Sequence, residues 1–264
     1  MTRTVVITGA SSGVGLAAAE QFAAAGDDVV LVGRTPARLE EAAARVDAKD
    51  VFRADFSDLD QVRDLAAKLR AAYPRIDVLA NNAGGMVGSY RRTTDGFEAT
   101  IQGNHLAPFL LTHLLRDRLS GGRVVNTASQ AHLQGAPDPG DLAGEPGRYS
   151  SWRAYGASKA ANILFTVEAA RRWPDITSIA FHPGVVRSNF GAGRFTRLFW
   201  KYNPFLTSSE KAGALLVRLA GRPDATSGGY YVGDSLKQPA RHASDPAAAA
   251  RLWDASEEAT GVRG

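Results

Sequence analysis

Short apolar, β-branched runs alternate with longer segments of helical periodicity along most of this 264-residue chain, and this alternation constrains the fold more than any other feature. The strand-like runs cover residues 5–8, 29–32, 51–54, 76–80, 123–127, 176–181 and 229–232. The segments with helical spacing cover residues 14–25, 36–46, 59–72, 108–119, 152–172 and 208–220. Continuous apolar strands separated by helices are typical of a parallel sheet that is buried on both faces. The sequence therefore predicts one α/β domain over residues 1–264, a doubly wound parallel sheet of about seven strands with helices on both faces.

Two irregular stretches follow predicted strands, at the positions where doubly wound folds place their ligands. Residues 130–151 are rich in proline and glycine, and residues 189–207 are rich in aromatic side chains and arginine. We expect the first to be a substrate insertion and the second to be a lid over an apolar substrate. The second stretch contains an apolar stripe at helical spacing, formed by Phe195, Leu198, Phe199 and Tyr202. A stripe that packs on the core or on a second subunit is an equally good interpretation.

The composition excludes several classes of function. The chain has no cysteine, so disulfides, zinc–thiolate sites and thiol nucleophiles are impossible. Its 31 Lys and Arg against 27 Asp and Glu give a net charge of +4, but the basic residues are scattered, which argues against nucleic-acid binding. No apolar stretch reaches the ~18 residues of a transmembrane helix, and the N-terminus does not resemble a signal peptide. We therefore expect a cytoplasmic protein. We also expect no bound metal, since His105, His132 and His182 are not at metal-ligand spacing.

A glycine-rich loop leaves the first predicted strand and opens the first predicted helix, with the sequence Thr8-Gly9-Ala10-Ser11-Ser12-Gly13-Val14-Gly15. Glycines let the backbone turn tightly and approach a pyrophosphate without a clash from a Cβ atom. The helix N-terminus that follows offers free N–H groups and the positive end of the helix dipole. The loop therefore predicts a dinucleotide site on a Rossmann-type sheet, with a plain glycine-rich turn as the alternative.

Several motifs, in the same order along the chain, resemble those of the short-chain dehydrogenase/reductase family. They are the loop spacing Gly-x-x-x-Gly-x-Gly, Asn81-Asn82-Ala83-Gly84, Asn104, Ser129, Tyr155-Gly-Ala-Ser-Lys159, and Pro183-Gly184 with Ser188 where threonine is usual. The resemblance covers about residues 3–235. It implies an oxidoreductase that transfers hydride between a nicotinamide cofactor and an alcohol/carbonyl pair, and it implies a homodimer or homotetramer.

One branch of the family is more similar than the others. Tyr155 follows Ser129 by 26 positions, about twice the spacing of many members, so the chain carries an insertion. This spacing, Asn104-His105-Leu106 and the run over residues 160–165 resemble the retinol-dehydrogenase-like and protochlorophyllide-reductase-like branch. Relatives in that branch often use lipophilic substrates, so the resemblance implies a fairly apolar substrate.

The position after the second strand predicts which cofactor is preferred. Gly33 stands where NAD enzymes carry a carboxylate for the ribose 2′-OH, and Arg34 follows it. A guanidinium can bind a 2′-phosphate in a bidentate manner, which favours NADP(H) over NAD(H), unless Arg34 is simply a surface residue. Asp55 resembles the family aspartate that contacts the adenine, with a helix N-cap as the alternative. The cofactor residues implied by the resemblance are Gly9, Ser11, Ser12, Gly13, Val14, Gly15, Arg34, Asp55, Phe56, Asn82, Ala83, Gly84, Tyr155, Lys159, Pro183, Gly184, Val186 and Ser188.

Tyr155 and Lys159 supply the proton chemistry that reduction of a carbonyl requires. Four residues apart on a helix, they share one face, and a nearby ammonium lowers the pKa of a tyrosine from its usual ~10. By the family resemblance, Lys159 also binds the nicotinamide ribose, Ser129 holds the substrate oxygen and Asn104 supports a water-mediated proton path. Tyr149 is a rival candidate, but it has no lysine four residues later, and we reject it.

The sequence thus predicts an NADP(H)-dependent oxidoreductase that interconverts an alcohol and an aldehyde or ketone, with Tyr155 as the general acid/base. Two alternatives stay open. The first is a nucleotide-binding regulatory protein without turnover, and the second is another chemistry on this scaffold, such as epimerisation, dehydration or reduction of a carbon–carbon double bond.

Overall fold

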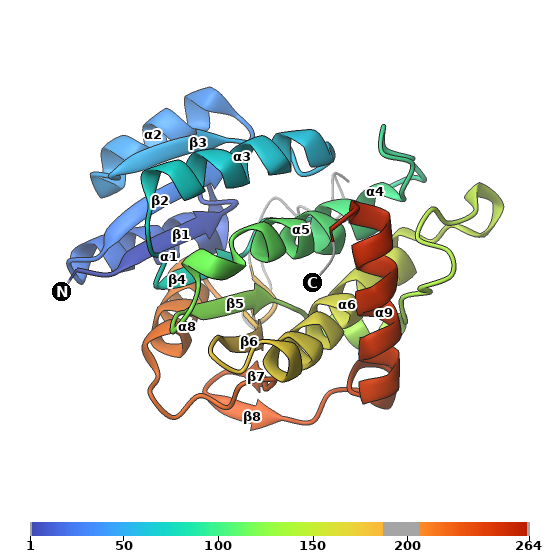
Figure 1. Cartoon of the computed structure of the whole chain (residues 1–264). Coiled ribbons are helices and arrows are strands. Elements are labelled where there is room, and N and C mark those ends of the chain that lie inside the picture. The colour runs from blue at the N-terminus through green and yellow to red at the C-terminus, as the bar shows by residue number, and fades with distance from the viewer. Residues whose placement is uncertain (1, 187–205, 263–264) are drawn as a thin grey trace.

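The computed structural model describes residues 2–186 and 206–262, which form one sheet with helices on both faces (Figure 1). The sheet has eight strands in the order β3-β2-β1-β4-β5-β6-β7-β8. They are β1 (Thr4–Thr8), β2 (Asp28–Gly33), β3 (Asp50–Arg53), β4 (Val78–Asn81), β5 (Arg123–Thr127), β6 (Thr177–His182), β7 (Tyr230–Val232) and β8 (Ser235–Lys237). The first seven are parallel and β8 is antiparallel to β7, so the predicted doubly wound parallel sheet is confirmed, with one further short strand.

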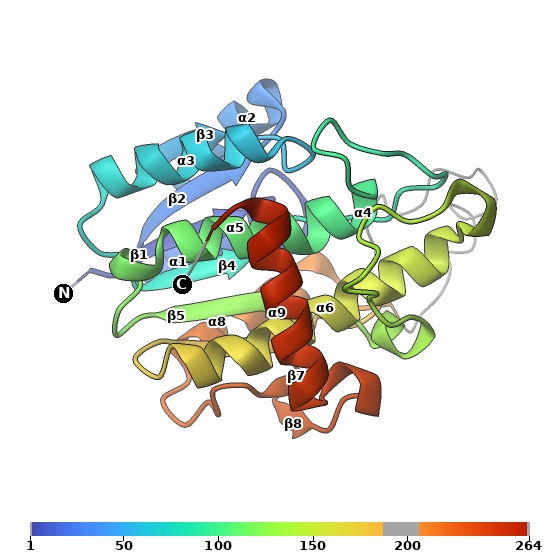
Figure 2. The same ribbon diagram turned by 45° about the vertical axis from the view of Figure 1, so that its right-hand side comes forward.

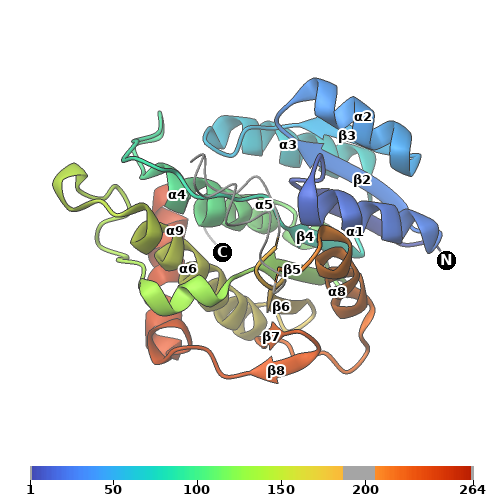
Figure 3. The ribbon, with the colours of Figure 1, turned by 180° about the vertical axis from the view of Figure 1, so that it is seen from behind.

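The helices fall into two layers. On one face of the sheet lie α3 (Leu59–Ala72), α5 (Ala107–Leu114) and α6 (Ser151–Arg172), and the opposite view shows α1 (Gly13–Ala24), α2 (Pro36–Val46) and α8 (Ser209–Gly221) on the other face (Figure 3). A short α4 (Ala99–Ile101) precedes α5, and α9 (Pro246–Thr260) follows β8. The direction of the strand order changes between β1 and β4, so the carboxyl ends of these two strands form the crevice in which such sheets bind ligands.

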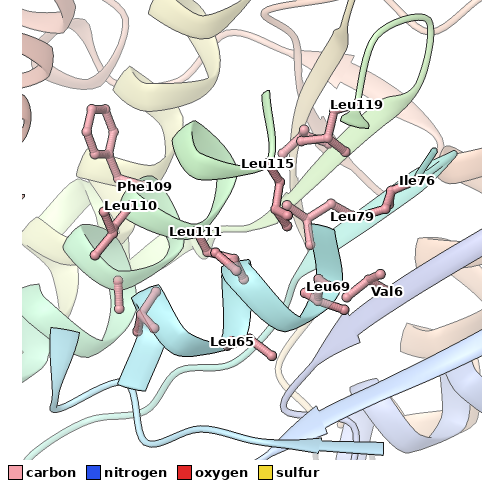
Figure 4. Close-up of a cluster of buried hydrophobic side chains, with 14 of the residues drawn as sticks. Val6, Leu65, Leu69, Ile76, Leu79, Phe109, Leu110, Leu111, Leu115 and Leu119 are labelled. Carbon is pink, nitrogen blue, oxygen red and sulfur yellow. The ribbon is translucent and has the colours of Figure 1, made fainter. Parts of the chain in front are cut away.

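Alternation along β1 divides the core between the two layers. Val6 faces α3 and α5, whereas its neighbours Val5 and Ile7 face α1 and α8. Figure 4 shows the first of these clusters, in which strand residues meet the leucines of α3 and α5. Each fully buried Leu, Ile or Phe stabilises the fold by ~1.5–3 kcal/mol, so the two clusters hold the strand ends rigidly in place.

The last helix was not predicted. α9 crosses the outer side of α5 and α6 (Figure 2), where the ring of Trp253 packs against four other rings, one of them that of His113. The ring centroids lie 5.0 Å from Phe109, 5.8 Å from Phe165 and 4.8 Å from Trp173. Through Trp253, α9 therefore covers Phe109, Phe165 and Trp173 on α5, α6 and the residue that follows α6.

The two irregular stretches differ in what the structure describes. The insertion contains two short 3₁₀ turns, Gln130–Gln134 and Pro146–Arg148, and extends beyond the carboxyl edge of the sheet (Figure 1). The predicted lid, residues 189–207, lies outside the described residues except for its last two positions, and so do all four residues of its apolar stripe.

Candidate active site

Thr8, the last residue of β1, binds the loop that follows β4. Its Oγ1 donates to the carbonyl oxygen of Ala80 at 3.2 Å and accepts the backbone N–H groups of Asn82 and Ala83, each at 3.0 Å. Nδ2 of Asn82 donates back to the carbonyl oxygen of Thr8 at 3.0 Å. These bonds fix the loop after β4 against the glycine loop. Thr8 was not predicted as a site residue, because its partners are more than 70 residues away in sequence.

The glycine loop is so close to its neighbours that two of its positions exclude a side chain. Gly9 has φ +67°, and a Cβ atom there would lie 2.9 Å from Cα of Ala83. A Cβ atom on Gly15 would lie 2.5 Å from the carbonyl oxygen of Gly9 and 2.6 Å from Nδ2 of Asn82. Ser12 precedes α1 but its side chain makes no capping bond, and the first turn has no acidic residue. The N-terminal N–H groups of α1 are therefore available to an anion such as a pyrophosphate.

Ser129 and Tyr155 are brought together by β5 and α6. Ser129 lies two residues beyond the end of β5, where its Oγ accepts the N–H of Ala131 at 3.2 Å. The hydroxyl groups of Ser129 and Tyr155 are joined by a hydrogen bond. Nζ of Lys159 donates to the carbonyl oxygen of Thr127 at 2.9 Å and lies 5.5 Å from the centroid of the Tyr155 ring. The structure thus assembles the predicted serine, tyrosine and lysine at one place.

Burial is the largest cause of the pKa shifts of the tyrosine and the lysine. It raises the pKa of Tyr155 to about 12, although the hydrogen bond with Ser129 acts in the opposite direction. It lowers the pKa of Lys159 to about 8. The expected lowering of the Tyr155 pKa by Lys159 is therefore wrong for this structure, because loss of hydration penalises the phenolate and the ammonium points to Thr127. Tyr155 is held as a neutral phenol, which is the form that donates a proton.

Asn104 joins the loop after β4 to α6. It lies in a π-helix, Gln102–Leu106, a distortion often found at functional sites. Its Oδ1 accepts the N–H of Gly85 at 2.8 Å, and its Nδ2 donates to the carbonyl oxygen of Gly85 and to Oγ of Ser158, each at 2.9 Å. A Cβ atom on Gly84 would lie 2.8 Å from Oδ1 of Asn104 and 3.5 Å from Nζ of Lys159. The asparagine and the lysine therefore border the same space beside Gly84.

Arg34 and Asp55 lie close to each other at the ends of β2 and β3. Arg34 is exposed. Burial acts to raise the pKa of Asp55, but hydrogen bonds from Ser57 and the nearby guanidinium groups of Arg34 and Arg91 outweigh it and lower that pKa. Asp55 is not the N-cap of α3, because Asp58 has that role, whereas Phe56 is a core residue. Arg91 was not predicted here, since nothing in its local sequence indicates that it approaches β3.

The Pro183-Gly184 pair follows β6 at the same edge of the sheet. Gly184 has φ +89°, and a Cβ atom there would lie 2.2 Å from Oγ1 of Thr207, so only glycine fits. Val186 forms an isolated parallel bridge with Thr207. Ser188 lies outside the described residues.

Two further residues fix the segments around the site. His132 accepts the N–H of Ala240 at Nε2 (3.1 Å), so its Nδ1 carries the proton and donates to the carbonyl oxygen of Ser129 (2.8 Å). His132 thereby links the turn that begins at Ser129 to the segment after β8. The rejected tyrosine, Tyr149, donates to the carbonyl oxygen of Val87 at 2.7 Å and so ties the insertion to the loop after β4.

We predict that stability falls when the pH is lowered from 7 to 5. Burial lowers the pKa of His105 and of His182 to about 4, well below the usual 6.5. Between these two values the unfolded chain binds protons that the folded chain excludes, so stability is lost as the pH falls through this window. Each histidine contributes roughly 1–2 kcal/mol to this loss at pH 5. Urea unfolding at both pH values measures it.

The variants His105→Asn and His182→Asn separate this effect from the titration of carboxylates. Each variant is expected to reduce the difference in unfolding free energy between pH 7 and pH 5. An unchanged difference in both variants would contradict the assignment of these histidines as neutral buried groups.

Within the part of the chain that the structure describes, no helix is long and apolar enough to cross a membrane. In the same residues, no three histidine or acidic side chains come together in a group that could hold a metal ion.

The sheet, the glycine loop and the Ser129–Tyr155–Lys159 group together define a short-chain dehydrogenase/reductase, and the chain belongs to this family: the family model for short chain dehydrogenases matches residues 3–197. A Streptomyces sp. (strain C5) protein provisionally named daunorubicin C-13 ketoreductase DnrU is 52% identical, over 98% of this chain and 93% of that protein. Human retinol dehydrogenase 12 is 38% identical, over 99% of this chain and 87% of its own. The predicted resemblance to the retinol-dehydrogenase-like branch is confirmed, and the chain is an oxidoreductase of the alcohol/carbonyl class.

Solved structures show the same fold. A protein of uncharacterized function from Mycobacterium paratuberculosis has a TM-score of 0.82 and 35% identity, over 99% of this chain and 94% of its own. A short chain dehydrogenase from Shigella flexneri, crystallised with NADP, has a TM-score of 0.68 and 23% identity, over 88% of this chain and 97% of its own. At 23% identity, the comparison with the Shigella flexneri protein shows a common fold and nothing further.

Proposed function

We propose that this enzyme uses NADP(H) to reduce a ketone or aldehyde, or to oxidise the corresponding alcohol, with Tyr155 as the general acid/base. The observation that carries the proposal is the hydrogen bond between Ser129 and Tyr155, with the buried Lys159 beside the tyrosine ring. A hydroxyl pair of this kind can donate a hydrogen bond and a proton to one carbonyl oxygen. A protein that only senses the nucleotide has no need of such a donor.

The residues present fit a dinucleotide. Gly9 and Gly15 let the glycine loop pack directly against the loop after β4, and the N–H groups of α1 are not capped by a side chain, so they can bind a pyrophosphate. Gly84 keeps the space beside Lys159 and Asn104 free of a side chain. When bound, the nicotinamide supplies or accepts the hydride. We propose the remaining cofactor contacts at the positions implied by the family resemblance, including Asp55 and the Pro183-Gly184 pair.

The proton steps follow from the state of the side chains. In reduction, Ser129 donates a hydrogen bond to the substrate oxygen, and the neutral Tyr155 gives its proton to that oxygen as negative charge develops. Lys159, with a pKa of about 8, would return a proton to Tyr155 through the water-mediated path that Asn104 supports. In the direction of oxidation, each step runs in reverse.

The substrate class is proposed from the relatives. One is named as a ketoreductase of daunorubicin and others as retinol dehydrogenases, so both names refer to large organic molecules. We propose a bulky, largely apolar alcohol/carbonyl pair, with walls provided by the loop after β4, the insertion and the predicted lid. The expected cytoplasmic location and the homodimer or homotetramer stay predictions, which cell fractionation and light scattering would test.

Arg34→Ala is expected to raise the Kd for NADPH by about 10- to 100-fold and to leave the Kd for NADH unchanged. The reason is that a charge-assisted hydrogen bond contributes ~1.5–3 kcal/mol, and only NADPH has the 2′-phosphate that Arg34 would bind. Titration of each nucleotide by quenching of protein fluorescence measures both constants. Arg38→Ala, an exposed arginine in α2, is the matched control. An equal rise in the Kd for NADPH and for NADH in Arg34→Ala would contradict the assignment of NADP(H).

A further inference from the structure

Among residues 2–186 and 206–262, five large apolar side chains are strongly exposed, and three of them lie on segments that form the candidate site. Leu133 (58% exposed) is in the 3₁₀ turn that begins after Ser129, Trp152 (51%) is one turn before Tyr155, and Val185 (48%) directly follows Gly184. The other two, Val51 and Leu236, are on the edge strands β3 and β8. The Trp152 indole is half exposed, so its apolar surface is available to a ligand that binds at the site.

Trp152 extends the surface of the reacting tyrosine. The centroids of the Trp152 and Tyr155 rings are 6.2 Å apart, and the ring planes are tilted by 32°. This separation is within the 4.5–7 Å range at which aromatic rings interact favourably. A flat molecule whose carbonyl oxygen reaches Tyr155 would therefore pass over or along the indole.

The backbone that carries Trp152 is packed closely against the turn after Ser129. A Cβ atom on Gly135 would lie 2.4 Å from the carbonyl oxygen of Arg153, and one on Gly156 would lie 2.6 Å from the carbonyl oxygen of Ala131. The 3₁₀ turn after Ser129 is thus in direct backbone contact with the first two turns of α6. Ser129, Trp152 and Tyr155 are thus carried by two segments in direct backbone contact, and the ring contact places the indole beside the proton donor.

We propose that Trp152 is a specificity-determining residue, a stacking surface that selects ketones borne on flat, aromatic ring systems. The proposal rests on the proposed carbonyl reductase function and deepens it by naming the substrate class. The face of a planar ring system can lie against the indole and gains stacking as well as burial, whereas a puckered saturated ring of the same size gains burial alone.

Two ketones with the same carbon skeleton test the proposal, 2-acetylnaphthalene and its saturated counterpart 2-acetyldecalin. Reduction by NADPH is measured for the wild type, Trp152→Ala, Trp152→Phe and the distant control Leu236→Ala. We expect Trp152→Ala to lower kcat/KM for 2-acetylnaphthalene by about tenfold, mainly by raising KM. For 2-acetyldecalin, kcat/KM should change by less than about threefold. Trp152→Phe should retain most of the preference, and Leu236→Ala should change neither ketone.

The other outcomes separate this proposal from the proposed function. If Trp152→Ala lowers kcat/KM equally for both ketones, or for neither, the proposed stacking surface is overturned and the proposed reductase function stands. If calorimetry on the NADP⁺ complex shows Trp152-dependent binding of 2-acetylnaphthalene but no ketone is turned over, the stacking surface stands and the reductase function fails. If a broad screen finds no ketone that binds and none that is turned over, both proposals are overturned.

Discussion

Tyr155→Phe is expected to reduce kcat for carbonyl reduction by about 10²- to 10⁴-fold and to leave the Kd for NADPH unchanged. General acid catalysis contributes a factor of this size, and phenylalanine cannot donate a proton to the substrate oxygen. The ring itself remains, so the contact with Trp152 and the burial of Lys159 are kept. Steady-state turnover and a fluorescence titration with NADPH, on the same preparation, give the two quantities.

Tyr149→Phe is the matched control, because it removes the hydroxyl of the other tyrosine of this region. That hydroxyl donates to the carbonyl oxygen of Val87, so its loss is expected to lower the free energy of unfolding by ~1 kcal/mol. The variant should change kcat little. If Tyr155→Phe retained a tenth of the wild-type rate, or if Tyr149→Phe lost as much as Tyr155→Phe, the assignment of the general acid would be wrong.

Trp253→Ala is expected to lower the free energy of unfolding by ~3–5 kcal/mol. The indole is buried at 2% exposure, and its ring meets the rings of Phe109, Phe165 and Trp173. Since a domain is stable by only ~5–15 kcal/mol in total, this one substitution would remove a large share. The midpoint of guanidinium unfolding measures the loss.

Trp152→Ala serves as the comparison for that measurement, because its indole is half exposed. It should change the unfolding free energy by less than about 1 kcal/mol. A loss below 1 kcal/mol in Trp253→Ala would mean that α9 contributes little to the stability of the fold.

The strands of the sheet could be predicted because their residues are apolar and β-branched over whole runs, as in Val29–Val30–Leu31–Val32. β8 could not, because its three residues, Ser235–Lys237, are all exposed and form a strand only through pairing with β7. α9 was missed for a related reason. Its apolar stripe is short: Ala249, Leu252 and Trp253 are buried, but the stripe continues with the polar Ser256 and Thr260.

In the site, the Tyr155–Lys159 pair could be predicted from its spacing on one helix, and the glycine loop from its strand–loop–helix context. Thr8 and His132 could not, since each acts through backbone groups distant in sequence, such as those of Ala83 and Ala240. The direction of the Tyr155 pKa shift was wrong because burial, the dominant cause, depends on the packed structure.

The way α9 covers α5 and α6 also sets the order of events during synthesis. About 140 residues of chain separate Phe109 from Trp253, so a ribosome adding ~5–20 residues per second completes α5 on the order of ten seconds before its cover exists. During that interval the nascent polypeptide carries an uncovered aromatic face, which is the kind of surface that chaperones bind and that drives aggregation. The yield of native enzyme should therefore depend on translation speed and chaperone supply more than its final stability would suggest.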